Sequence, residues 1–461
     1  MSQTPSKSLL QLAWPLILSF WMRSLFNFVD AGFAATLGDA AVAAIGMTGA
    51  LEFLFIACWV GTSNGLTSLL SQAMGARQGE RIEQVLAATR RVVVVLIAFF
   101  MVVGAAVWLG ADLLAREPFG LEPPVVEAFR TYASVLTVGT ALTGFWSILP
   151  DSIVKAHQDT RATMWAGIAS NVLNVTLNAI FLFWFGWGIF GIALSTVLGR
   201  FAGLVYALKV ADRHERERKA AGEDVEPGLD PAPYRSLARL GVPAGLTFAL
   251  MGLEGLVVTW LLGTGEDSTV SLAAFTVYSR WQMFFMMPII ATGVALLPHV
   301  ARRYGARDFA GIRQGFWQGM GLGAAHSILL AWPVSVFLSR PLVAAFTDSP
   351  QAEDLAARAM LFVAPTCLIA LPYSLCRPVF EGLQRGAPGL VIAALRFGLL
   401  TIPCAFIGAA WAVRRGWPEL LGLIPGLMVA GAIASVVFLA WLLVYFRRCA
   451  AESAAPPETD G

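Results

Sequence analysis

Charged residues are scarce in this chain of 461 residues, and their shortage excludes a soluble fold. Only 13% of the residues are charged while 57% are hydrophobic, whereas a soluble domain carries roughly 25% charged residues. The net charge is only +2, which gives no reason to expect a nucleic-acid partner. We therefore expect a polytopic membrane protein.

The chain also has little that points to catalysis or to a metal site. Its five cysteines show no CxxC spacing, so we expect no disulfide and no cysteine-bound metal. Its four histidines lie more than twenty residues apart. The sequence holds no HExxH, Gly-x-Ser-x-Gly or Walker motif. We expect no catalytic residues and no cofactor, and any transport would be driven by an ion gradient rather than by ATP.

Long apolar stretches are abundant, and each is long enough to cross a bilayer as a helix of about 20 residues. Twelve of them are predicted, at residues 9–36, 49–73, 92–115, 127–153, 163–185, 189–210, 236–262, 269–299, 316–339, 355–382, 388–412 and 420–446. Spanning strands would need alternating apolar and polar residues, an alternation that the stretch Val92–Ile97 lacks. The predicted fold is an all-α integral membrane protein with twelve transmembrane helices.

The basic residues orient these helices in the membrane. Most of the 32 Lys and Arg residues fall in connections on one side, which the positive-inside rule assigns to the cytoplasm. We expect a multi-pass protein of the plasma (inner) membrane with both termini cytoplasmic. The first apolar stretch is longer than a signal-peptide core of roughly 7–15 residues, so we expect it to remain in the mature protein.

Three landmarks recur in the two halves of the chain, in the same order and at nearly one offset. They are the pairs Pro15 and Pro243, Arg77 and Arg307, and Gln158 and Gln384. The repetition predicts an internal duplication, with two pseudo-symmetric six-helix lobes around a central cavity.

A hydrophilic stretch lies between the halves and indicates a flexible cytoplasmic linker. The predicted domains are an N-terminal lobe at 1–212, the linker at 213–234, a C-terminal lobe at 235–448 and a disordered tail at 449–461.

Asp30 is an acid inside the first apolar stretch. A carboxylate at membrane depth is costly unless it is paired, hydrated or protonated, so it indicates a functional site. Asn27 shares its helix face, and Asn174 and Asn178 share a face of the fifth stretch. Burial disfavours the charged carboxylate while amides or a bound cation favour it, so a proton and a cation would compete there. The alternative is that Asp30 only holds helices together.

Other charges in the apolar stretches leave several interpretations open. Glu52 and Glu254 could attract a cationic substrate in the cavity, or they could lie at headgroup level or between helices. Arg23 lies seven residues before Asp30, and could be its counter-ion or extend to the membrane surface.

The C-terminal stretches carry further charges whose role the sequence does not decide. These residues are Arg280, Arg377, Glu381 and Arg396. The i, i+4 spacing of Arg377 and Glu381 favours a structural ion pair. If the arginines face the cavity instead, the substrate would be anionic or zwitterionic.

Several motifs, taken in order, resemble those of the multidrug and toxic compound extrusion (MATE) family. They are Leu12-Ala-Trp-Pro-Leu-Ile-Leu18, Leu37-Gly-Asp-Ala-Ala-Val-Ala-Ala-Ile-Gly46, Gly61-Thr-Ser-Asn-Gly65, Ser71-Gln-Ala-Met-Gly-Ala-Arg77, Asn171-Val-Leu-Asn-Val-Thr-Leu-Asn178 and Gly188-Ile-Phe-Gly-Ile-Ala-Leu-Ser-Thr196. The likeness is strong over the N-terminal half and looser over the C-terminal half.

The resemblance implies export of organic, often cationic or amphipathic, compounds by proton- or sodium-coupled antiport with alternating access. It implies a small-molecule substrate, a coupling cation and a bilayer as partners, and we expect a monomer. The implied ion site comprises Asp30, Asn174, Asn178 and Thr196. Asn178 stands where relatives commonly have an aspartate, and this departure favours protons over sodium.

The C-terminal half departs from the family as well. Met251 and Tyr373 stand where sodium-coupled members carry acids, so the resemblance does not transfer that ion site. Two other functions compete: a flippase for lipid-linked precursors from the same superfamily, and a membrane-embedded enzyme, which no motif supports.

Overall fold

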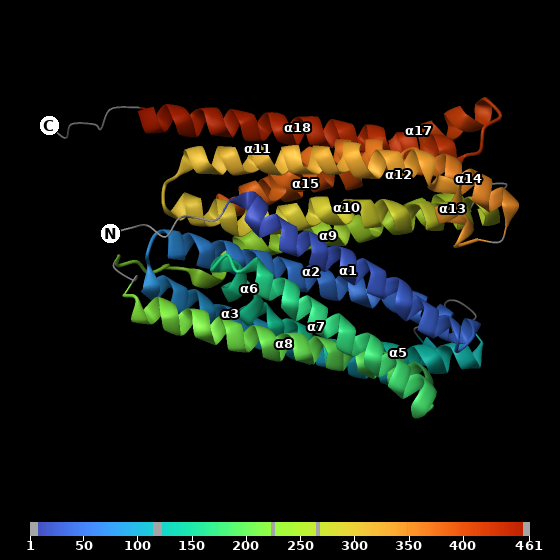
Figure 1. The fold of residues 1–461 in the computed structure, drawn as a ribbon, viewed down its shortest axis with the longest axis horizontal. Helices are drawn as coiled ribbons and strands as arrows, with labels where there is room; N and C mark the ends of the chain where they lie inside the picture. The colour runs from blue at the N-terminus through green and yellow to red at the C-terminus, as the bar shows by residue number, and fades with distance from the viewer. Residues whose placement is uncertain (1–7, 114–121, 223–225, 264–267, 348, 455–461) are drawn as a thin grey trace. The chain divides into compact units, whose positions relative to one another are not determined.

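The computed structural model of the chain describes the backbone of residues 8–113, 122–222, 226–263, 268–347 and 349–454. Within these ranges it leaves the side chains of residues 23, 25–28, 30, 31, 50 and 449–454 outside the description. The regular structure of the described ranges is helical and contains no strand (Figure 1).

Eleven of the described helices are long and apolar enough to cross a membrane. A further helix, α1 (Leu9–Ala35), stands at the position of the first predicted span. The predicted all-α membrane architecture is therefore confirmed.

Contacts within the chain group its residues into two compact units. The N-terminal unit comprises Trp14–Ala249, and the C-terminal unit comprises Met1–Ala13 together with Leu250–Gly461. The boundaries differ from those of the predicted lobes because two helices are divided: the start of α1 belongs to the C-terminal unit, and the first half of α9 (Pro233–Gly263) belongs to the N-terminal unit.

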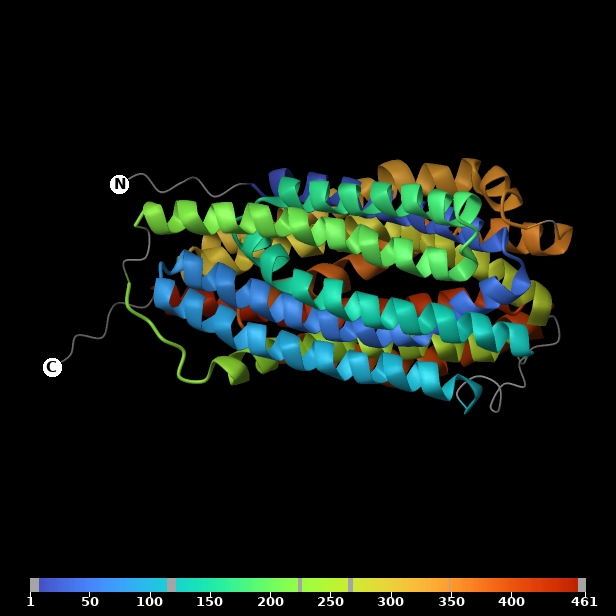
Figure 2. The same ribbon diagram turned by 90° about the horizontal axis from the view of Figure 1, so that it is seen from below.

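The N-terminal unit is a bundle of long helices with an aromatic core. Its other helices are α2 (Asp39–Gly75), α3 (Gly79–Ala111), α5 (Pro123–Thr140), α6 (Trp146–Ala156), α7 (Thr160–Ala179) and α8 (Gly188–Ala220). The rings of Phe55, Phe100 and Phe145 meet in its centre with centroids 4.5–5.7 Å apart, among buried leucines of α2. Helices α7 and α8 run side by side in both views (Figures 1 and 2).

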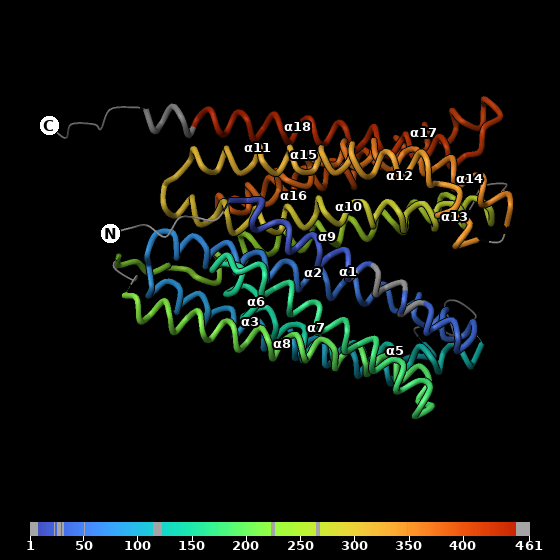
Figure 3. The backbone as a smooth tube through the Cα atoms, viewed as in Figure 1, coloured from blue at the N-terminus to red at the C-terminus, as the bar shows by residue number. Residues whose placement is uncertain are grey.

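The C-terminal unit is also a helical bundle, with several helix interruptions. Its helices are α10 (Ser268–Gly305), α11 (Phe309–His326), α12 (Trp332–Phe337), α13 (Ser339–Ala344), α14 (Pro350–Met360), α15 (Val363–Gly382), α16 (Ala387–Ala393), α17 (Thr401–Arg414) and α18 (Leu420–Ala454). Helix α15 packs against α10 and α18 (Figure 3), and the stacked rings of Phe380 and Phe438 join α15 to α18.

The predicted span at 355–382 is broken in two, which corrects that prediction. Helix α14 ends at Met360 and α15 begins at Val363. Pro365 explains the break, because a proline lacks the N–H that would bond the carbonyl of residue 361 and its ring crowds that carbonyl.

The repeated landmarks of the sequence mark repeated structure. Arg77, Gln158, Arg307 and Gln384 end their helices with φ between 58° and 62°, and they are the non-glycine residues of the described chain with positive φ. The residue after each donates its N–H to the carbonyl five positions back, as Asp159 does to Val154. This is the bond that closes a Schellman helix end.

In the connection between the halves, the structure describes residues 213–222 and 226–232, and part of this connection is helical. The flexibility of the linker stays a prediction. Helix α8 continues through residues 213–220. Beyond it, the side-chain amide of Gln84 bonds both backbone groups of Asp230, at 2.8 and 2.9 Å, and the N–H of Glu226 donates to the carbonyl of Arg77. The side chain of Gln84 in α3 and the carbonyl of Arg77 thus satisfy backbone groups of the linker.

Helices α2 and α9 cross with their backbones in contact inside the N-terminal unit. A Cβ at Gly61 would lie 2.6 Å from the carbonyl oxygen of Gly241, and one at Gly245 would lie 2.8 Å from that of Ala57. Small residues permit such close packing of helices in membranes.

Replacing Gly61 with alanine should therefore destabilise the unit, because the new Cβ meets backbone that no rotamer change can move. We expect a loss of about 1–3 kcal/mol, seen as a lower melting temperature of the purified protein. Gly46→Ala, on the same helix with open space around its Cβ, is the matched control. Equal melting of the two variants would contradict the crossing.

Candidate ion site and charged clusters

A polar cluster lies between α7 and α8 in the N-terminal unit. It is formed by Asn174 and Asn178 of α7 with Ser195 and Thr196 of α8. The hydroxyl of Ser195 donates to Oδ1 of Asn178 at 2.5 Å, and Nδ2 of Asn174 donates to Oγ1 of Thr196 at 3.2 Å. Asn178 and Ser195 are fully buried and Asn174 is 6% exposed. Their mutual hydrogen bonds offset the cost of burying amides in a membrane helix.

Local sequence explains why the two helices come close enough for these bonds. Asp159 caps the start of α7 by accepting the N–H of Ala162. Gly199 lets α8 approach, because a Cβ there would lie 2.6 Å from the carbonyl oxygen of Ser170 and 2.9 Å from Cβ of Asn174. The contact holds the hydroxyls of α8 within reach of the amides of α7.

The structure thus brings together three of the predicted site residues, Asn174, Asn178 and Thr196, and adds Ser195. Ser195 directly precedes Thr196 within a motif already noted in the sequence, so a search for hydroxyls beside Thr196 would have found it. Asp30, Asn27 and Arg23 lie on α1, but their side chains are outside the described part. Their place in the site stays a prediction.

The acids proposed for the cavity lie in different settings. Glu52, on α2, is exposed. Glu254, on α9, is half-buried and accepts a 2.9 Å hydrogen bond from the hydroxyl of Thr401 in α17. Whether either acid attracts substrate stays a prediction.

The four charged residues that the sequence singled out in the C-terminal unit divide into an ion pair and two arginines that lie over aromatic rings. Arg377 and Glu381 of α15 lie 3.6 Å apart, the spacing expected of a structural ion pair, and Glu381 is 3% exposed. The guanidinium of Arg280 lies 6.0 Å from the ring of Phe346. Arg396 lies in the π-helical segment η5 (Ala394–Leu400) and stacks on the rings of Tyr373 in α15 and Phe397 in η5.

A second polar cluster fixes the charged end of α8, and sequence reasoning missed it. The rings of His157 and His214 stack with centroids 5.0 Å apart. Nε2 of His157 lies 2.9 Å from Glu215, and Nε2 of His214 lies 2.9 Å from Asp159. Arg218, nearly buried, also donates to Glu215. Partners 55–58 residues apart in sequence give no local signal.

The electrostatics of this cluster make it resistant to acid. Burial alone raises the pKa of the Glu215 carboxyl, but hydrogen bonds from His157 and Arg218 and the charge of Arg218 lower that pKa to about 2. A lowered pKa means that the ionised carboxylate stabilises the fold above its ordinary pKa of 4.5. This stabilisation is lost as the pH falls toward 2.

We expect Glu215→Gln to loosen the end of α8 at neutral pH by about 1–3 kcal/mol, because it weakens hydrogen bonds to charged partners. Amide hydrogen exchange of residues 213–220 measures the effect, and an acid titration should no longer show the transition between pH 4.5 and 2. Glu217→Gln, at a side chain that is 64% exposed, should exchange as the unaltered protein does. Equal exchange in both variants would contradict the assignment.

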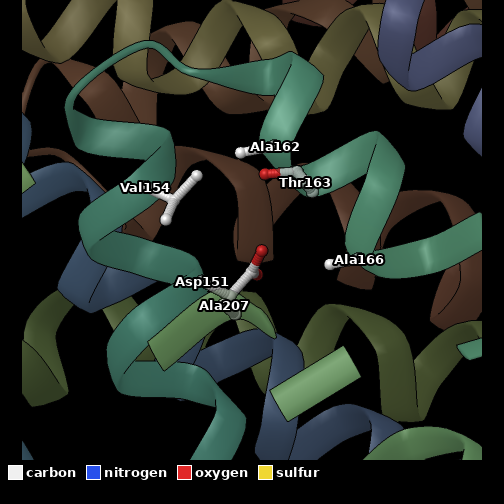
Figure 4. A pocket seen from close by; sticks show the side chains of 6 residues that line it. All are labelled: Asp151, Val154, Ala162, Thr163, Ala166 and Ala207. Atoms are coloured by element: carbon white, nitrogen blue, oxygen red, sulfur yellow. The ribbon is translucent and has the colours of Figure 1, made fainter. Parts of the chain in front are cut away.

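A small pocket lies between α6, α7 and α8. Figure 4 shows the carboxylate of Asp151 and the hydroxyl of Thr163 on opposite sides of it. Asp151 pairs with Lys155 at 2.6 Å, and alanines form much of the rest of the lining. The pocket is too small to hold an organic substrate.

The MatE family model matches this chain over residues 15–180 and again over 243–407. The chain belongs to the MATE family. The two matches begin at Pro15 and Pro243, the first pair of repeated landmarks, and together they cover most of both halves. The chain is therefore a multi-pass membrane transporter and not an enzyme, as predicted.

Similar proteins support this assignment. An uncharacterized transporter of Bacillus subtilis, YisQ, is 23% identical, with 78% of each chain covered. YoeA of the same species, a probable multidrug resistance protein, is 28% identical over 68% of this chain and 69% of its own. NorM of Bacillus cereus, also a probable multidrug resistance protein, is 24% identical over 91% and 92%.

Solved structures share the fold. One is an outward-facing multidrug resistance MATE family transporter of the MOP superfamily, with a TM-score of 0.81 at 20% identity and 97% of both chains covered. Another is a MOP superfamily transporter from Pyrococcus furiosus whose binding pocket is described as reversed in polarity, with a TM-score of 0.83 at 20% identity and 96% of both chains covered.

Proposed function

We propose that this protein exports organic, cationic or amphipathic compounds in exchange for protons, and that Asp30 with the α7–α8 cluster is the ion site. The exchange would proceed by alternating access of the two units, in the plasma membrane, with both termini in the cytoplasm and a monomer as the working unit. Like other transporters of its family, it would need no cofactor.

The observation that carries the proton assignment is the chemistry of the α7–α8 cluster. Its four side chains are two amides and two hydroxyls that bond to one another. Asn178 contributes a neutral amide oxygen that already accepts from Ser195. A sodium ion would thus have Asp30 as the one carboxylate among the proposed site residues, whereas a proton needs no more than that single acid.

The similar proteins support the cargo class. YoeA and NorM are described as probable multidrug resistance proteins, and a promiscuous exporter favours adaptable apolar surfaces over a dedicated motif. Neither of these two similar proteins is described as a lipid flippase.

Asp30→Asn should abolish efflux driven by an imposed pH gradient in proteoliposomes, because the amide cannot take up and release the proton. The protein should remain folded, since the substitution keeps size and hydrogen bonding. Glu127→Gln, which neutralises an exposed acid of α5, is the control and should leave the coupling intact. Unchanged efflux by Asp30→Asn would remove this residue from the mechanism.

The coupling ion is tested separately with the unaltered protein. Efflux should persist when sodium is replaced by a large organic cation and should collapse when the pH gradient is dissipated, because a site with one carboxylate suits a proton better than sodium. Efflux that survives without a pH gradient but stops without sodium would refute proton coupling.

A further inference from the structure

Arg396 places a positive charge inside an apolar helix of the C-terminal unit. It lies within the candidate span Ala387–Arg414, where a cation is costly and marks a functional site. Arg396 forms no ion pair and no hydrogen bond with any described residue, and its Nε atom is buried. A buried donor without an acceptor lacks the compensation that burial requires.

Aromatic rings hold the guanidinium of Arg396 in place. Its central carbon lies 4.9 Å from the ring centre of Tyr373 and 4.7 Å from that of Phe397, which is the geometry of a cation–π contact. The two rings meet edge to face. These contacts orient Arg396 but leave its N–H groups without acceptors.

Tyr373 supplies a second unused donor beside the first. The residue is only 6% exposed, and its hydroxyl is buried with no hydrogen-bond partner in the described chain. The site therefore combines a guanidinium with a phenol O–H, both of them donors that lack acceptors.

Glu254 is an acid of the same unit whose charge acts on both donors. Its carboxylate accepts a hydrogen bond from Thr401, and its charge interacts with both Arg396 and Tyr373. It nevertheless forms no direct ion pair with Arg396 among the described contacts. Glu254 thus lowers the electrostatic cost of Arg396 without occupying its N–H groups.

We propose that Arg396 and Tyr373 bind a carboxylate group of the exported compound within the C-terminal unit. A carboxylate accepts two parallel hydrogen bonds from a guanidinium, and the phenol O–H would supply a third. When Glu254 is ionised, it competes with this ligand by repelling its charge. The proposal rests on the export function proposed above and adds compounds that carry a carboxylate to the cargo.

The competing interpretation is that Glu254 is simply the counter-ion of Arg396 and that the site is structural. The two interpretations differ in what they predict for the unaltered protein. A structural counter-ion leaves Arg396 with no preference for a carboxylate ligand, whereas a binding site prefers a carboxylate to its neutral ester.

Equilibrium binding to the full-length purified protein distinguishes them. The ligands are a fluorescent amphipathic probe with one carboxylate and its methyl ester, followed by fluorescence polarisation. The unaltered protein should prefer the acid to the ester by about tenfold, the effect of a charge-assisted hydrogen bond. Arg396→Gln should lose this preference while ester binding stays the same, and Glu254→Gln should bind the acid several-fold more tightly.

Tyr373→Phe should weaken acid binding by about threefold, because only one hydrogen bond to the carboxylate is lost. Arg415→Gln is the matched control, since Arg415 also stacks on a ring, that of Trp411 at 4.5 Å, but lies outside the site. It should change neither affinity. If Arg396→Gln fails to fold, as a thermal melt would show, Tyr373→Phe and Glu254→Gln still decide the question.

Equal binding of acid and ester to the unaltered protein would overturn the proposal, as would weaker acid binding by Glu254→Gln. A second experiment distinguishes failure of the carboxylate site from failure of proton-coupled export. It measures the efflux of a permanent organic cation that carries no carboxylate. If the pH gradient still drives that cation out, proton-coupled export stands and only the carboxylate site falls.

Discussion

The structure depends on how polar groups are satisfied where no water is available to bond them. In the N-terminal unit, Gly199 lets α7 and α8 touch, and Asn174, Asn178, Ser195 and Thr196 bond to one another across that contact. An unsatisfied amide at this depth would cost several kcal/mol. These amides and hydroxyls must bond to one another to be buried, and the bonds fix their positions. The proposed ion site requires oxygens held at fixed positions.

Outside the membrane core, the constraint is met by different chemistry. The stacked histidines and Arg218 hold the end of α8 through charged hydrogen bonds, and Gln84 satisfies the linker backbone at Asp230. The connection between the halves is thereby anchored to the N-terminal unit. The first half of α9, which contains the start of the second repeat at Pro243, belongs to this unit as well.

Hydropathy and repeated landmarks were sufficient to predict the helical fold and its duplication, because bilayer thickness and helix geometry constrain every span in the same way. The break after Met360 was missed, although Pro365 signals it, because the apolar stretch continues across it. The pairing of His157 with Glu215 depends on tertiary contacts, which no local pattern encodes. Among the site residues, Asn174, Asn178 and Thr196 do lie together, as the family motifs implied, while Ser195 emerged only from the hydrogen bonds.

The central claim is that inward proton flow and outward cargo flow are obligatorily linked. The most direct measurement is proton flux across proteoliposomes that contain purified protein and an internal pH-sensitive dye, recorded when a transported organic compound is added without any imposed pH gradient. The account predicts that protons move opposite to the compound and only while it moves. Movement of the compound with no accompanying change in internal pH would contradict it.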